Sequence, residues 1–152
     1  MKKLLILLSF LATTVLVRAQ GNPEEAAVKK TIDALFDGMR NADTALAASA
    51  FADKCIMQTI AKTREGKVIV RNEDAQKFAA SIGGTHPKYD ERIQYTKILI
   101  DGELASVWTD YKFYLGDKFS HCGVNFFQLM KTTEGWKIIY IVDTRRKDNC
   151  VE

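Results

Sequence analysis

Apolar residues between Asn22 and Asp43 recur three or four positions apart, as they do on one face of a helix. Asn22 is a good N-cap, and Pro23 suits the first helical turn. The pattern predicts a long amphipathic helix that packs in the core through one stripe: Val28, Ile32, Leu35, Phe36 and Met39.

Shorter elements follow, and then the pattern changes to one of alternating polar and apolar residues that favours strands. The segments expected before this change are a helix over 43–51, a hairpin over 54–72 with its turn at Glu65–Gly66, and a helix over 72–84 capped by Asn72. The segments expected after it are four strands over 89–101, 104–115, 118–131 and 135–146. The order ααββαββββ predicts an α+β fold in which a curved antiparallel sheet wraps around the long first helix and leaves a pocket at its open end.

The beginning of the chain has the pattern of a secretory signal peptide. A basic start precedes the apolar run of residues 4–17, and Ala19 ends a suitable cleavage site. The alternative is a membrane anchor, but the run is shorter than the roughly 20 residues that a spanning helix needs. We therefore expect residues 1–19 to be removed and residues 20–152 to form a single exported domain, periplasmic or secreted, with no membrane partner.

Removal of that segment also changes the charge of the protein. The whole chain has a formal charge of +3, and Lys2, Lys3 and Arg18 account for three positive charges, so residues 20–152 are close to neutral. Such a domain is not expected to bind nucleic acid. With two histidines and no CxxC motif, the sequence also predicts no metal site and no cofactor.

Three cysteines allow at most one internal disulfide. The expected strand pairing places Cys122 opposite Arg146, within reach of a returning tail, which favours a Cys122–Cys150 bond. Cys55–Cys150 is the alternative.

The turns between the last strands predict which side chains share a face. A three-residue loop at 133–135 would pair Thr132 with Trp136 and Asn125 with Asp143, and a two-residue loop at Gly116–Asp117 would pair Leu115 with Lys118. Counting from these turns gathers six candidate ligand-binding residues on one face: Trp108, Asp110, His121, Asn125, Asp143 and Arg145. A slip of one residue would replace them with the other face: Tyr111, Cys122, Tyr140 and Thr144.

Each candidate has a chemical role and a structural alternative. Asn125 in mid-strand needs hydrogen-bond partners if it is buried. Asp143 either orients His121, which would let the two act as acid–base groups, or forms an ion pair with Arg145. A free Arg145 would favour a partly apolar, anionic ligand.

The segment ASVWTDYKFYLGDKFSHCGVNFFQLMKTTEGWKIIYIVDTRRKDNC resembles the nuclear transport factor 2-like (NTF2-like) superfamily of cystatin-like α+β cones. Within it, the W-x-x-Y, H-C-G-V-N, G-W-K-I and D-T-R-R series is similar to the exported bacterial "putative lumazine-binding" or SnoaL-like branch. The resemblance implies a cone-shaped α+β barrel that is often dimeric. It implies function less closely, because the superfamily includes isomerases, dehydratases, hydrolases, ligand carriers and association domains.

Superfamily enzymes typically add a carboxylate or tyrosine from the first helix or first strand. Here the helix offers Phe36 and Met39, and the strand offers Met57 and Gln58. We therefore favour a small-ligand binder or association domain over a dehydratase, isomerase or hydrolase that uses His121 and Asp143.

A homodimer is also expected, because both faces of the last strand carry large apolar side chains and one helix layer covers only one face. The two expected sets are Trp136, Ile138 and Tyr140 on one face and Ile139 and Ile141 on the other.

Export predicts a specific change in mass. Protein recovered from the periplasm or medium should lack residues 1–19 and begin at Gln20, and intact-mass spectrometry measures this directly. Exported protein that still carries Met1 would contradict the prediction.

Overall fold

The structure, a computed structural model, describes residues 22–151. It contains three helices and six strands in the expected order ααββαββββ. The helices are α1 (Pro23–Asn41), α2 (Thr44–Ser49) and α3 (Ala75–Ser81). The strands are β1 (Phe51–Lys62), β2 (Val68–Asp74), β3 (Tyr89–Asp101), β4 (Leu104–Leu115), β5 (Lys118–Thr132) and β6 (Gly135–Arg146). The expected signal peptide lies outside the described residues, and no helix among the described ones has the length and apolar character to cross a membrane.

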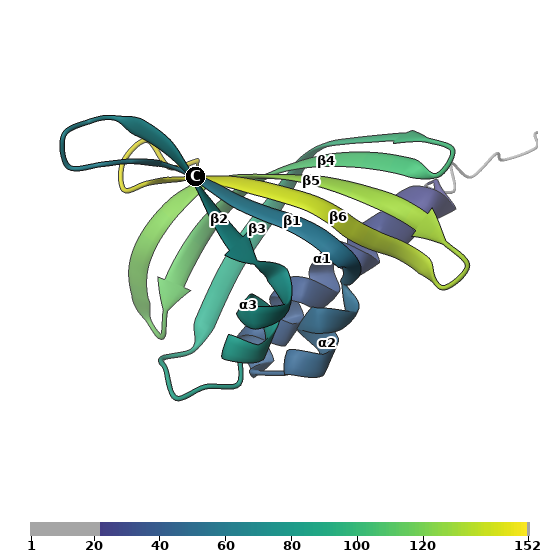
Figure 1. Cartoon of the computed structure of the whole chain (residues 1–152), viewed down its shortest axis with the longest axis horizontal. Coiled ribbons are helices and arrows are strands. Elements are labelled where there is room, and N and C mark those ends of the chain that lie inside the picture. Colours follow the sequence, from purple (N-terminus) through teal and green to yellow (C-terminus); the bar gives the residue numbers. More distant parts are fainter. Residues whose placement is uncertain (1–21, 152) are drawn as a thin grey trace, which may run out of the picture.

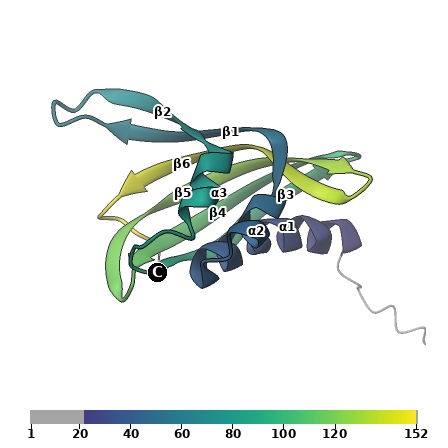
Figure 2. The same ribbon diagram turned by 60° about the horizontal axis from the view of Figure 1, so that its bottom comes forward.

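All six strands form one curved sheet in the order β2-β1-β6-β5-β4-β3. β1 runs parallel to β6, and the other neighbours are antiparallel. The three helices lie together on the concave side, and the β1–β2 hairpin extends beyond the rest of the sheet (Figures 1 and 2). The sheet does not close on itself, so the space between its inner face and the helices stays open at one end.

α1 lies in the curve of the sheet because its apolar stripe packs against the inner face of the sheet. Asn22 caps it by accepting a hydrogen bond from the Glu24 amide, and the predicted stripe is buried in the core. Polar contacts fix its first turn and its middle: the Glu24 carboxylate accepts from Lys131 and from the Trp136 indole, and Asp33 accepts from the Tyr95 hydroxyl.

The cap of α3 is Asp74, and the prediction of Asn72 is wrong. The Asp74 carboxylate accepts hydrogen bonds from the Gln76 and Lys77 amides. Asn72 lies inside β2, where it pairs with Gln58 across the hairpin. The strand continues two residues further than the cap pattern suggested, because its ladder to β1 runs as far as Asp74.

A bulge in β6 changes which residues face the core. Gln128 pairs with Tyr140 and Leu129 with Ile138, so Ile139 has no partner opposite it. Trp136, Ile138 and Ile141 therefore all face inward and are buried, instead of lying on opposite faces as expected.

A second bulge, in β5, shifts the pairing with β4 by one residue. Leu115 pairs with Lys118 as predicted, but the next pairs are Tyr114 with Phe119 and Phe113 with His121, which leaves Ser120 unpaired. From this point Tyr111 lies opposite Gly123 and Thr109 opposite Asn125. The inner face of β4 therefore carries Tyr111 and Phe113, whereas the prediction placed Trp108 and Asp110 there.

A disulfide joins Cys122 to Cys150, with 5.8 Å between the two Cα atoms. Cys122 lies opposite Arg146, as the strand count indicated. The bond ties the tail after β6 back to β5 and leaves Cys55 as a free, partly buried thiol.

Gly123 allows Tyr111 to cross β5 and reach β6. A Cβ at this position would overlap the carbonyl oxygen of Thr144 and lie 2.9 Å from the Tyr111 ring. With only a hydrogen there, the Tyr111 hydroxyl can donate to the same carbonyl oxygen at 2.9 Å.

Gly123→Ala is therefore expected to lower the free energy of unfolding by about 2 kcal/mol or more, because a backbone atom must move to accept the methyl group. Urea denaturation measures the loss. Gly102→Asn is the control, since Gly102 has a left-handed φ of 56° that Asn tolerates and no atoms near its missing Cβ. Equal stability of the two variants would contradict the close packing at Gly123.

Candidate functional site

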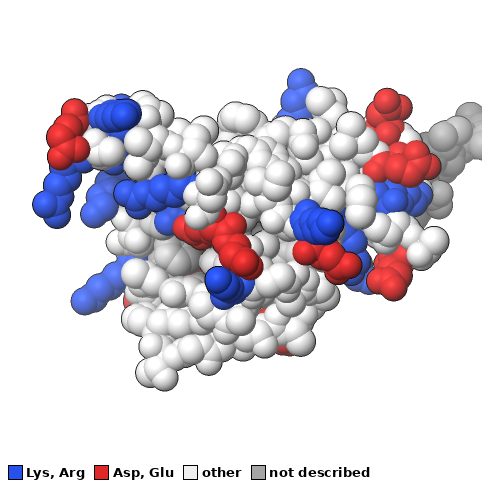
Figure 3. Space-filling view, in the orientation of Figure 1, with Lys and Arg blue, Asp and Glu red and all other residues white. Residues whose placement is uncertain are grey.

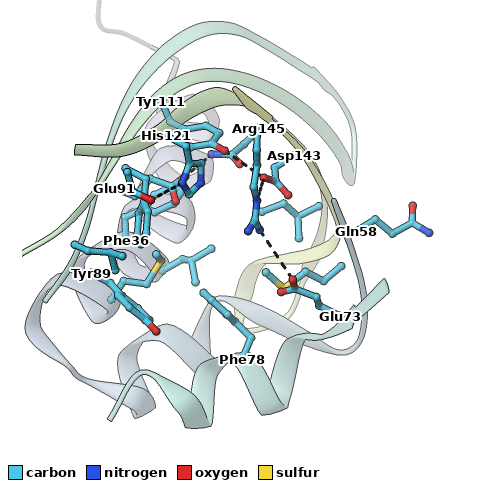
Figure 4. Close-up of a pocket in the computed structure, with 18 residues that line it drawn as sticks. Phe36, Gln58, Glu73, Phe78, Tyr89, Glu91, Tyr111, His121, Asp143 and Arg145 are labelled. Carbon is cyan, nitrogen blue, oxygen red and sulfur yellow. Dashed lines mark hydrogen bonds and ion pairs between the residues drawn. The ribbon is translucent and has the colours of Figure 1, made fainter. Parts of the chain in front are cut away.

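A cavity of about 440 Å³ lies between the concave face of the sheet and helices α1 and α3 (Figure 4). Much of its wall is apolar, with Phe36 and Met39 from α1, Phe78 from α3 and Phe113 from β4. The strand ends add a cluster of polar and charged side chains: Glu73, Glu91, Tyr111, His121, Asn125, Asp143 and Arg145.

Asp143 is the centre of a hydrogen-bond network that joins three strands. Its carboxylate accepts from Thr59 on β1 and from Arg145 Nε on its own strand at 2.8 Å. It also lies 3.2 Å from the Tyr111 hydroxyl on β4, whose one proton is shared between this carboxylate and the Thr144 carbonyl oxygen. Burial and the neighbouring carboxylates raise the pKa of Tyr111, so its hydroxyl keeps its proton. With these donors in place, Asp143 positions its neighbours and has little capacity left for a ligand.

Arg145 is also engaged by protein groups. Its Nη2 donates to Thr59 at 3.0 Å and lies 4.0 Å from a carboxylate oxygen of Glu73 on β2. The ion pair between Asp143 and Arg145 is thus the arrangement present, and within residues 22–151 no hydrogen bond joins Asp143 to His121. In Figure 4 Arg145 points between Asp143 and Glu73.

Asn125 is 3% exposed and finds its partner in Glu91 on β3. Its Nδ2 donates to Glu91 Oε1 at 2.7 Å. Burial raises the pKa of Glu91 to about 7, and the Asp143 charge adds to this, whereas the Asn125 hydrogen bond and the Arg145 charge oppose it. The cavity therefore contains a carboxyl group that changes its charge near neutral pH.

His121 lies beside Glu91 in Figure 4. Its Nδ1 is 3.0 Å from the Ser120 hydroxyl, and its ring packs against the rings of Tyr111 and Phe113. Burial lowers the pKa of His121, and the Arg145 charge adds to this while the Asp143 charge opposes it. The imidazole is therefore neutral at physiological pH.

Four of the six residues expected at the site line the cavity: His121, Asn125, Asp143 and Arg145. Trp108 and Asp110 do not, and this part of the prediction is wrong. The bulge at Ser120 turns both outward: Trp108 is 48% exposed beside Phe126, and Asp110 lies in an outer groove with Arg92 and Lys112.

Tyr111 takes their place, although the count from the turns assigned it to the other face. The remaining members of that face, Cys122, Tyr140 and Thr144, do not line the cavity.

Glu91 was missed by the sequence reasoning. It stands between Asp90 and Arg92, and Asp90 forms ion pairs with Arg40 and Arg92. The charge pattern of the sequence alone does not show which of the two carboxylates, Asp90 or Glu91, faces the cavity. The available signal was the alternation of β3, since Tyr89, Ile93 and Tyr95 share the face of Glu91 and pack against the core.

The described residues contain no group of three His, Cys, Asp or Glu side chains arranged to hold a metal ion. The chemistry that the cavity offers is that of a shaped apolar space with one titrating carboxyl, one amide and one neutral imidazole at its polar end.

Comparisons with known proteins agree on the fold. A crystal structure of an NTF2-like protein of unknown function from Shewanella baltica OS155 superposes with a TM-score of 0.67 at 17% identity, covering 83% of this chain and 96% of that one. A cystatin-like domain of unknown function from Nostoc punctiforme PCC 73102 gives 0.65 at 15% identity, covering 86% and 82%.

A structure from Novosphingobium aromaticivorans, described as a putative aromatic ring hydroxylase, gives 0.61 at 13% identity, covering 81% and 89%. No curated protein matches the chain. Residues 23–142 match the family described as "Putative lumazine-binding". This match spans nearly all of the described fold, and with the structural likeness it shows that the chain belongs to the "Putative lumazine-binding" family of NTF2-like, cystatin-like α+β proteins.

Proposed function

We propose that this chain is an exported protein that binds a small, partly apolar molecule in the cavity between α1 and the sheet. The observation that carries the proposal is the Glu91–Asn125 pair. A plain core would fill these positions with apolar side chains, because burying a carboxyl group is costly. Here the pair faces a cavity whose wall combines apolar and aromatic side chains with a few polar groups, which is the usual composition of a ligand site.

The family description supports a small-molecule ligand, and lumazine is the first compound to test. The geometry does not favour the alternative of acid–base catalysis by His121 and Asp143. Asp143 is occupied by Thr59, Tyr111 and Arg145, so it is not placed to orient the imidazole.

Ligand binding is tested with protein purified from its native compartment. Mass spectrometry of the small molecules released on denaturation should identify a bound compound, and that compound should raise the melting temperature of the emptied protein. In the Asn125→Leu variant, the compound is expected to cause no increase in melting temperature, because Leu cannot form a hydrogen bond to Glu91.

The matched control is Asn72→Leu, which makes the same change on the exposed edge strand outside the cavity and should leave binding intact. The absence of any co-purified molecule, together with no stabilisation by lumazine or by a diverse library, would contradict the proposed function.

We also propose that two copies pair through the outer face of the sheet. This face carries large apolar side chains that nothing in the described part of the chain covers: Leu99, Leu104, Trp108 and Met130 are 56%, 48%, 48% and 41% exposed. In the view of Figure 3, Lys and Arg lie beside Asp and Glu over the strands, so no large field of a single sign covers that side of the molecule.

Trp108→Glu should convert a dimer into a monomer at micromolar concentrations, because it places a charge in the middle of the apolar patch. Light scattering coupled to gel filtration gives the mass. Gln76→Glu adds the same charge on α3 and should not change it. A wild-type protein that is strictly monomeric at these concentrations would rule out the dimer.

A further inference from the structure

We propose that the cavity selects ligands that carry a cationic nitrogen group, which the Glu91 carboxyl and the Asn125 amide oxygen bind, and that it disfavours carboxylates. The inference rests on the proposed function, because it names the class of ligand that the same cavity takes. It also reverses the expectation of an anionic ligand that Arg145 suggested in the sequence.

The charges around the cavity favour a cation. Three carboxyl groups line the cavity, those of Glu73, Glu91 and Asp143, against the single guanidinium of Arg145. Arg145 is already paired with Asp143 and lies near Glu73, and His121 is neutral. The charge of Arg145 is therefore compensated by these carboxylates. The electrostatic potential inside the cavity is negative whenever Glu91 is ionised.

Two oxygen atoms at the polar end of the cavity are left without hydrogen-bond donors among the described residues. Among the described residues, Glu91 Oε1 accepts from Asn125 Nδ2, but Glu91 Oε2 and Asn125 Oδ1 have no donor. Neither oxygen belongs to the fully buried, unsatisfied atoms of the structure, so both remain accessible from the cavity. Two free acceptors on adjoining side chains match a ligand that presents N–H donors.

Aromatic rings form part of the same cavity wall. Phe36, Phe78, Tyr89 and Phe113 line the cavity, and aromatic rings attract cations as well as planar apolar groups. The cavity thus suits a flat, partly apolar body with a positive nitrogen at the end that meets Glu91.

Three probes that each carry a single benzene ring and differ in charge distinguish a preference for cations from a preference for neutral or anionic ligands. Benzamidine is cationic, benzamide is neutral and benzoate is anionic. Calorimetric titration of the purified, ligand-free protein at pH 8 should give an affinity for benzamidine about tenfold or more above that for benzamide, because hydrogen bonds to charged groups are stronger. Benzoate should bind most weakly. Binding of benzoate as tight as that of benzamidine overturns the inference.

The affinity for benzamidine should also rise about tenfold from pH 6 to pH 8, because the pKa of Glu91 is about 7 and the cation binds the ionised form. The groups around Glu91 are Asn125 and His121 on β5, Tyr111 on β4, Asp143 and Arg145 on β6, and Arg40 on α1, which donates to the Glu91 carbonyl oxygen. Of these, His121 has its pKa lowered below its ordinary value of 6.5, so it is neutral through the middle and upper part of this range, where Glu91 changes its charge. A flat profile for benzamidine contradicts the assignment of Glu91.

Glu91→Gln keeps the volume and an oxygen that can accept from Asn125 but removes the charge. The variant should lose both the preference for benzamidine and its pH dependence. It should be at least as stable as the wild type at pH 8: since the pKa of Glu91 is raised from 4.5 to about 7 on folding, the wild type loses stability as the pH rises through this window.

Glu103→Gln makes the same change at the exposed turn between β3 and β4 and should behave as the wild type does. Retention of the benzamidine preference in Glu91→Gln overturns the inference. If Glu91→Gln does not fold, the probe series and the pH profile of the wild type decide the question.

The outcomes also separate this inference from the proposed function. If uncharged or acidic library compounds bind while benzamidine does not, the charge preference is wrong and the ligand site remains. If no compound of any charge binds, both proposals fail.

Discussion

The carboxylate of Asp143 holds together the end of the sheet that forms the cavity. It accepts hydrogen bonds from groups on β1, β4 and β6, strands that are far apart in sequence. Tyr111 can reach it only because Gly123 leaves room on the intervening strand. A half-buried carboxylate with this number of donors is satisfied within the protein, so its role is to set the positions of Tyr111, Thr59 and Arg145. The polar end of the cavity takes its shape from that one group.

Much of the fold could be predicted from the sequence, because the signals that define it are local. The stripe from Val28 to Met39 predicted the first helix, and the pairs Glu65–Gly66 and Gly116–Asp117 marked turns that the structure contains. Strand bounds follow from turn residues and from alternation, both of which are visible within a few positions. The prediction of the α3 cap failed because it depends on a non-local interaction: the length of β2 is set by its pairing with β1.

The site depends on register, and register depends on bulges that leave no clear mark in the sequence. In the β5–β6 hairpin the error at the turn, where Thr132 pairs with Gly135, is cancelled by the bulge at Ile139, so Asn125 still faces Asp143. In the β4–β5 hairpin the turn was right, but the bulge at Ser120 exchanged the two faces of β4. Glu91 could have been found by combining the alternation of β3, which places it on the core face, with the question of which side chain satisfies the buried amide of Asn125.

The disulfide has a consequence for where this protein can be expected to persist. It closes a loop of 28 residues, and a cross-link of that length lowers the entropy of the unfolded chain by an amount worth about 3–4 kcal/mol at 25 °C. Domains of this size have total stabilities of only about 5–15 kcal/mol. A large fraction of the folding free energy is therefore available only where thiols are oxidised, and the same chain kept in a reducing compartment would spend more time unfolded and exposed to proteases.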